Sequence, residues 1–432
     1  MALMAAAERW AGSTGGGQDD LLALHLADSV AAGLAGLARG TAGPPIYSQG
    51  DVAGRIGAVV AATRSTEVDD IHMAACVTPG AIVVPVALGL IAAGLADPAR
   101  LGQALGVGYD AMIGLGLAIG GPAALYAGVW PTMAVAPLGA AITAGSALGL
   151  DATGLAHAMA MSVPFASGRC GHARGGHTSR WLLIGEAARA GVVAALAAKA
   201  GYAGDLNLLQ PDRLAAALGV PVSYAAEFGP RRNEIGFKPI CAAKQTMAAV
   251  AAFRGMLAKG LDPATIEAIQ VQVPPAYRAM IAARHQGASD RLGSITNIAY
   301  QLSLVAYHPE RLLDIARLPL VDDAAAIALA AKVRVLEDQE LATAYPQKWP
   351  ARLRVRIAHS WDERTIEVAP GDAGTGFDQQ ALANKIAQLF AVNGVSHQVD
   401  HLIAASDAAL TDPDPALEVA SLLFSKAEHQ RI

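Results

Sequence analysis

The sequence predicts a mainly α fold: a large all-helical domain, residues 1–262 completed by 401–432, plus a smaller α+β lid domain over residues 263–400. Composition is the first observation behind this prediction, because alanine and glycine dominate the apolar 53% of the chain while aromatic residues make up 5%. Small apolar side chains of this kind favour closely packed helices. The second observation is a change near residue 262, where long apolar blocks give way to short segments of alternating polarity. The third is length, since 432 residues are enough for two domains.

The helical domain is expected to open with the segment DDLLALHLADSVAAGLAGL, in which Asp19 or Asp20 caps a helix. Apolar residues recur along this segment at helical spacing. Residues 78–85 are expected to open another helix of this domain. Further helices are predicted in the apolar block 105–150 and over residues 182–201 and 247–259. Pro122 and Pro131 interrupt the long block and leave Trp130 in a loop.

The α+β domain is expected to contain four strands, because four segments alternate in polarity with period two. They are centred near Ile269, Val333, Val355 and Ile366. Helices are predicted over residues 294–307, 322–332 and 377–390. A last helix, residues 415–426, is expected to rejoin the helical domain.

The apolar block 105–150 is long enough to suggest membrane-spanning helices. Prolines interrupt it, its residues are mostly alanine and glycine, and no Lys/Arg-rich segment flanks it. Helices that are apolar all round also occur inside large soluble domains. We therefore expect no membrane insertion.

Charge and cysteine content point to a cytoplasmic protein without a nucleic-acid partner. The net charge is −5, and no basic face dominates. Three cysteines give no disulfide framework, as expected in a reducing compartment. The opening segment MALMAAAERWAG lacks the basic start and continuous apolar core of a signal peptide.

Three polar segments interrupt the apolar helices, and each carries one of the three cysteines. They are GRCGHARGGHTSRWLLIG (residues 168–185), TRSTEVDDIHMAACVTPG (63–80) and RRNEIGFKPICAAKQT (231–246). Glycine lets the backbone approach a ligand closely, and the planar guanidinium of arginine can donate two hydrogen bonds to one carboxylate. The segments therefore favour a site for an anionic small molecule, with solvated surface loops as the alternative.

A metal site is not expected. Glu67, Asp69, Asp70 and His72 are the closest approach to a ligand set, but their tight spacing is not a standard one. A solvated helix end is the favoured interpretation of this cluster. We expect neither a metal nor an organic cofactor.

Several ordered segments resemble the MmgE/PrpD family, which includes 2-methylcitrate dehydratase, cis-aconitate decarboxylase and iminodisuccinate epimerase. SRWLLIGEAA is similar to the family's TKPLHxGxAA, EVDDIH to its DFDD, TPGAIVVP to its HPSxxVxP, and KPICAAKQTMAAVAA to its KPYPCCRxTHxAIDA. The resemblance spans nearly the whole chain. It implies an enzyme that acts on a small di- or tricarboxylate.

The departures from the family motifs concern the groups that move protons. Thr78, Leu183 and Met247 stand where dehydratase and decarboxylase members have histidine, and Arg180 stands where they have lysine. Trp130 lies near the position of another histidine of the decarboxylases. A guanidinium does not readily exchange a proton, and a thioether cannot. The segments RGGHTSRW and KPICAAKQTM look closest to the iminodisuccinate epimerase branch of the family, a cofactor-free isomerase, with a lyase as the alternative.

Epimerisation requires two proton-transfer groups on opposite faces of one carbon and cations on its carboxylates. The preferred pair is His177 and Lys238, with Asp69, Asp70 and Lys244 in reserve. The substrate-binding candidates are Arg180, Arg169, Thr78, Trp130, Cys241 and Gln245. Arg180 and Lys238 are expected to converge in one pocket, where Arg180 clamps a carboxylate.

Other interpretations stay open. A lyase could use Asp69, Asp70 or His72 in place of the missing histidines. A thiolate pair among Cys76, Cys170 and Cys241 could move the proton instead. A carboxylate-binding carrier without catalysis is a third possibility. Broad apolar helix faces predict a homodimer.

Overall fold

The computed structural model describes residues 2–13, 19–39, 51–170, 179–224, 228–282, 291–316 and 323–424. These residues form two compact units, one from the described residues within 1–171, 179–237 and 378–432, the other from the described residues within 238–377. The first unit is almost entirely helical, and the second combines helices with a four-stranded sheet. The predicted mainly α fold class is confirmed.

The helical unit contains thirteen α-helices within the described residues. They are α1 (Ala2–Ala11), α2 (Asp20–Ala38), α3 (Val52–Ser65), α4 (Gly80–Ala92), α5 (Leu101–Ala118), α6 (Pro122–Tyr126), α7 (Pro131–Ala147), α8 (Ala152–Ser162), α9 (Ser179–Lys199), α10 (Pro211–Leu218), α17 (Gln379–Asn393), α18 (Val399–Ala408) and α19 (Pro413–Phe424). A short antiparallel pair, β1 (Ile71–His72) and β2 (Ile235–Gly236), joins two of its loops. The predicted cap of α2 is confirmed, since the Asp19 carboxylate accepts a hydrogen bond from Leu22 N.

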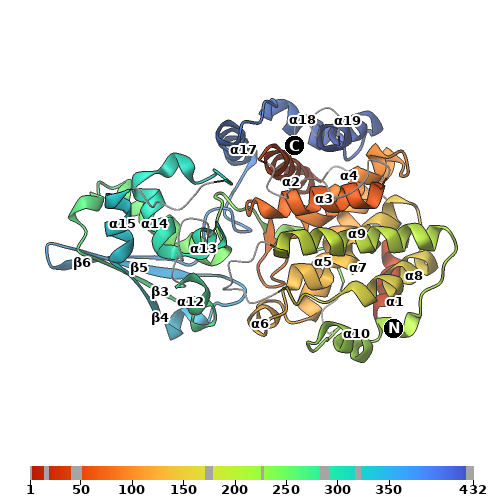
Figure 1. The fold of residues 1–432 in the computed structure, drawn as a ribbon, viewed down its shortest axis with the longest axis horizontal. Coiled ribbons are helices and arrows are strands. Elements are labelled where there is room, and N and C mark those ends of the chain that lie inside the picture. Colours follow the sequence, from red (N-terminus) through yellow and green to blue (C-terminus); the bar gives the residue numbers. More distant parts are fainter. Residues whose placement is uncertain are drawn as a thin grey trace. The chain divides into compact units, whose positions relative to one another are not determined.

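Small residues allow the central helices to approach closely. Helix α9 packs against α3, α7 and α8 (Figure 1). At the α3–α9 crossing, a Cβ atom on Gly185 would lie 2.3 Å from the carbonyl oxygen of Gly57. Glycine is therefore required at this crossing, because any side chain would separate the two helices.

The C-terminal helices complete the helical unit. Helices α17 and α18 pack against α2, and α19 packs against α4. A buried contact ties this segment to α2: the Lys385 ammonium lies 2.5 Å from Asp28 Oδ1 and donates to Val68 O at 2.7 Å. The chain thus returns to the helical unit at residue 378.

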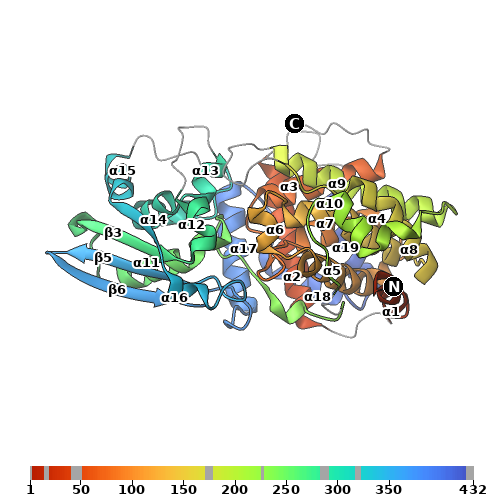
Figure 2. The same cartoon turned by 90° about the horizontal axis from the view of Figure 1, so that it is seen from below.

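The second unit is built on a sheet of strand order β4-β3-β5-β6. The strands are β3 (Ala268–Val273), β4 (Val333–Glu337), β5 (Ala351–Ile357) and β6 (Ser360–Ile366), with β3 and β4 parallel and the other pairs antiparallel. The helices are α11 (Met247–Leu257), α12 (Pro275–Ile281), α13 (Arg291–Thr296), α14 (Ile298–Tyr307), α15 (Ala324–Ala331) and α16 (Gln339–Ala342). Alternate residues of β3 and β5 form one core with residues of α11 and α14. Figure 2 labels these two helices beside the strands.

The division between the units differs from the predicted one. It lies at residues 237/238 and 377/378, whereas the sequence suggested 262/263 and 400/401. Helix α11 reads as one more apolar helix, but its buried face packs on the sheet. Helix α17 follows the strands in the chain, yet it packs on α2. The role of the second unit as a lid stays a prediction.

The structure also differs from two local predictions, one for a helix and one for a strand. The helix predicted over residues 294–307 is broken at Asn297, whose side chain caps α14 by accepting from Tyr300 N. Strand β6 begins at Ser360, well before the alternating residues that suggested it, because Ala358 and His359 form a tight turn after β5.

Within the described residues, two helices are long and apolar enough to cross a membrane, namely α2 and α9. In α2, 78% of the apolar segment that meets this criterion is buried inside the structure. In α9, half of the corresponding segment is buried. A core helix of a soluble protein satisfies the same criterion of length and composition.

Candidate active site

The loop between α3 and α4 has an unusual backbone that is held by strand pairing. Two of its non-glycine residues have left-handed backbones, Glu67 with φ 59° and Cys76 with φ 53°. Such conformations persist only where the surroundings enforce them, and they are frequent at functional sites. Pairing of β1 with β2 and a bridge between His72 and Val77 hold the loop in place.

Glu67 and Asp69 surround the buried guanidinium of Arg64. Arg64 Nη1 lies 2.8 Å from Glu67 Oε2 and 3.3 Å from Asp69 Oδ1. Burial alone would lower the pKa of Arg64, but the two carboxylates raise it above its ordinary value. Trp181 Nε1 donates to Glu67 Oε1 at 3.2 Å and so connects this cluster to the first turn of α9.

Arg180, the residue before Trp181, is buried with 1% of its surface exposed. Its guanidinium carbon lies 4.4 Å from the centre of the Trp130 ring, which is a cation–π contact. Burial lowers the pKa of Arg180, while the charges of Glu67 and Cys170 oppose that shift. The group stays cationic at neutral pH, so it can bind an anion but is a poor proton donor.

Asp70 is occupied by structural contacts. One carboxylate oxygen accepts from Gly80 N at 2.9 Å, at the start of α4, and the other accepts from the Tyr109 hydroxyl at 2.8 Å. His25 Nδ1 lies 3.2 Å from the same second oxygen, and its ring stacks on Phe237. These contacts favour an anchoring role for Asp70, and its catalytic role stays a prediction.

His72 is held as a neutral imidazole. Its Nδ1 accepts from Ala75 N at 3.1 Å, so the proton resides on Nε2 and is directed at Glu234 Oε2, 3.0 Å away. Burial lowers the pKa of His72, and Glu234 only partly opposes the shift. Among the described residues, no group of three or more His, Cys, Asp or Glu side chains is placed to hold a metal ion.

The remaining predicted residues of the helical unit differ in their surroundings. Thr78 is buried, and its backbone N–H donates to Thr132 Oγ1 at 3.1 Å. Arg169 is exposed and donates to Gly219 O at 3.2 Å. Burial raises the pKa of the Cys170 thiol, against the influence of Arg180. His177 lies outside the described residues.

The KPICAAKQT segment of the second unit contributes buried lysines. Lys238 and Lys244 are 2% and 3% exposed, and the Lys244 ammonium contacts the carboxylate of Asp372. Burial and then the positive charge of Lys238 lower the pKa of Lys244 to about 7. Cys241 is buried, and its backbone N–H donates to Leu312 O at 2.9 Å.

Gln245 follows Lys244 in a 3₁₀ turn, Lys244–Thr246, and is also buried. Arg180 belongs to the helical unit and Lys238 to the second unit, so their convergence stays a prediction.

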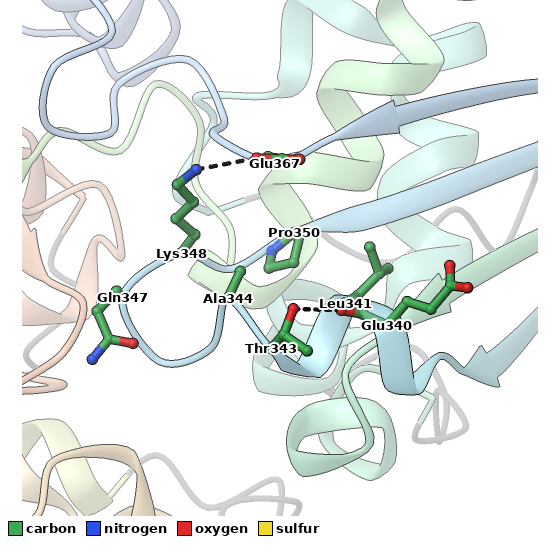
Figure 3. A pocket seen from close by; sticks show the side chains of 8 residues that line it. All are labelled: Glu340, Leu341, Thr343, Ala344, Gln347, Lys348, Pro350 and Glu367. Carbon is green, nitrogen blue, oxygen red and sulfur yellow. Dashed lines mark hydrogen bonds and ion pairs between the residues drawn. The ribbon is translucent and has the colours of Figure 1, made fainter.

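A surface pocket of about 460 Å³ lies at one end of the sheet in the second unit (Figure 3). It is lined by Glu340, Leu341, Thr343, Ala344, Gln347, Lys348, Pro350 and Glu367. Lys348 and Glu367 form an exposed ion pair of 3.1 Å within it. None of these eight residues belongs to the predicted site, and the perturbed groups described above lie elsewhere.

Sequence reasoning missed three residues that organise these clusters. Arg64 stands beside the predicted acids, but its inward orientation depends on where α3 ends. Trp181 was part of a recognised motif without a role of its own. Asp372 lies in the loop APGDAGTG, more than a hundred residues from Lys244, and no spacing pattern connects the two.

The fold and these clusters define a helical protein with buried cations and carboxylates at its helix junctions. Residues 55–227 match the model of the MmgE/PrpD N-terminal domain. The segments EVDDIH, TPGAIVVP and SRWLLIGEAA lie inside the matched region, and KPICAAKQT lies outside it. None of the curated proteins matches the chain.

Proposed function

We propose that the whole chain is an MmgE/PrpD enzyme that acts on a small di- or tricarboxylate. The observation that carries this proposal is the buried Arg180 on the Trp130 ring, inside the region that matches the family domain. A guanidinium held in this way has a fixed orientation in which it can donate two parallel hydrogen bonds to one carboxylate. Residues that merely solvate a surface would be exposed instead.

The reaction we propose is epimerisation through proton abstraction next to a carboxylate, with an iminodisuccinate-like substrate. His177 and Lys238 are the preferred proton-transfer pair, with Asp69, Asp70 and Lys244 in reserve. Met247 stands where lyases of the family have a histidine, and it is part of the apolar core of the second unit. A lyase acting on a 2-methylcitrate- or aconitate-like substrate is the alternative.

Proton exchange separates the two reactions. The protein is incubated in heavy water with iminodisuccinate, aconitate or methylcitrate, and the products are followed by NMR. An epimerase is expected to introduce deuterium at the carbon next to a carboxylate while the carbon skeleton stays intact. Loss of water or carbon dioxide would instead identify a lyase, and binding without any exchange would identify a carrier.

A further inference from the structure

Asp372 is held rigidly in a tight loop of the second unit. Its Oδ2 accepts from Ala369 N at 2.9 Å, and its carbonyl oxygen accepts from the Thr375 hydroxyl at 2.7 Å. Gly371 supplies the left-handed backbone, φ 90°, that the turn requires. The side chain is 1% exposed, so its Oδ1 lies in the protein interior rather than in water.

That oxygen contacts the ammonium of Lys244. The lysine is equally constrained, because it begins the 3₁₀ turn that leads into α11, and the Thr246 hydroxyl closes this turn on Ala243 O at 2.8 Å. The Lys244 Nζ also lies 4.0 Å from Met247 Sδ. Two rigid backbone turns thus present an amine and a carboxylate to each other.

Within the described residues, the charged side chains that act on Lys244 include those of Lys238 and Asp372. Lys238 is the cation that acts on it, and burial together with that charge lowers the pKa of Lys244 to about 7. The carboxylate of Asp372 acts in the opposite direction by stabilising the ammonium. On the helices packed against this turn, Arg254 is exposed, the Tyr277 hydroxyl donates to Pro350 O, and Arg278 lies 3.8 Å from Glu337.

We propose that Asp372 is a positioning residue that orients Lys244 and sets its protonation, so that Lys244 is the amine that removes the substrate proton. This inference rests on the proposed function. In the step, the neutral Lys244 amine takes the proton, the C–H bond breaks, and its electron pair passes into the adjacent carboxylate as an enolate. The resulting ammonium is stabilised by Asp372. The protonated Lys238 donates its proton to the other face of the carbon and so completes epimerisation, and Lys244 then releases the abstracted proton to solvent while Lys238 takes one up.

Titration of Lys244 tests the proposal without any substrate. Lysines labelled with ¹³C at Cε are followed by NMR against pH, and the Lys244 signal is assigned by its loss in Lys244→Met. Asp372→Asn removes the charge that favours the ammonium, so the midpoint of Lys244 should move down by about one to three pH units. Asp372→Glu should restore the midpoint toward that of the wild type. A wild-type midpoint near 10, or one that Asp372→Asn leaves unchanged, would overturn the proposal.

Asp28→Asn is the matched control, because it removes an equally buried carboxylate from Lys385 in the helical unit. It should reduce stability and leave the Lys244 midpoint in place. In the heavy-water assay, the exchange rate is measured against pH. In Asp372→Asn the pH at which this rate rises should decrease by as much as the Lys244 midpoint does, while KM changes little. If the pH at which exchange rises is unchanged while the Lys244 midpoint moves, Lys244 is not the base. Lack of exchange with every carboxylate would contradict the proposed function, and the titration would still decide whether Asp372 governs Lys244.

Discussion

Substrate binding is expected to depend on the guanidinium of Arg180. Arg180→Lys keeps the positive charge but loses both the fork and the stacking on Trp130. It should weaken binding by one to two orders of magnitude, or roughly 1.5–3 kcal/mol for a charged hydrogen bond. Isothermal titration with the carboxylate measures this loss, and exchange at saturating substrate should survive.

Lys238→Ala is the complementary change. Exchange at neutral pH should be lost while substrate binding persists, because Lys238 either moves a proton or keeps Lys244 unprotonated through its charge. Recovery of exchange at higher pH would assign the second of these roles. If Arg180→Lys binds normally yet exchanges nothing, the roles of Arg180 and Lys238 are reversed.

Glu67 is expected to stabilise the helical unit through its contacts with Arg64 and Trp181. Glu67→Gln keeps the shape of the side chain and leaves a buried guanidinium with less negative charge. Removing one partner of a buried ion pair costs roughly 3 kcal/mol. Urea unfolding measures the loss, and Glu367→Gln is its control, because that residue forms an exposed pair and should cost about 1 kcal/mol or less. Equal effects of the two changes would contradict the prediction.

At the scale of elements, the α3–α9 crossing determines where Arg180 and Trp181 lie. Gly185→Ala should separate these helices, since the new Cβ would meet Gly57 O at 2.3 Å. Overpacking of this kind costs about 1–3 kcal/mol. The melting temperature should fall and KM should rise, because Arg180 is in the first turn of α9. Gly229→Ala, where a Cβ meets nothing within 4 Å, should change neither.

At the scale of the whole molecule, we predict a homodimer that needs no metal. Light scattering of a dilute solution should give twice the 44.0 kDa mass of one chain, and a value of 44.0 kDa would refute the dimer. Activity should survive exhaustive chelation. Activity that is lost on chelation and restored by an added metal would contradict the second expectation.

The predictable parts of the fold were those with a strong local pattern. The Asp19 cap, the helices interrupted at Pro122 and Pro131, and the alternating core of β3 and β5 all follow from nearest neighbours in the chain. The turn before β6 was missed because Ala358 and His359 adopt left-handed backbones with φ 45° and 66°. Asn-Gly is the usual signal for such a turn, and the sequence here lacks it.

For the candidate site, the sequence by itself determined which polar residues interrupt the apolar helices, because a charge inside such a helix stands out from its surroundings. Tertiary structure alone decided their partners. Asp372 lies against Lys244, Lys385 against Asp28, and Trp181 against Glu67. These contacts join residues far apart in the chain, and each depends on how whole helices and loops pack. Burial then shifts the pKa values of the ionisable groups, so the chemistry of the site is a property of the folded interior rather than of any local motif.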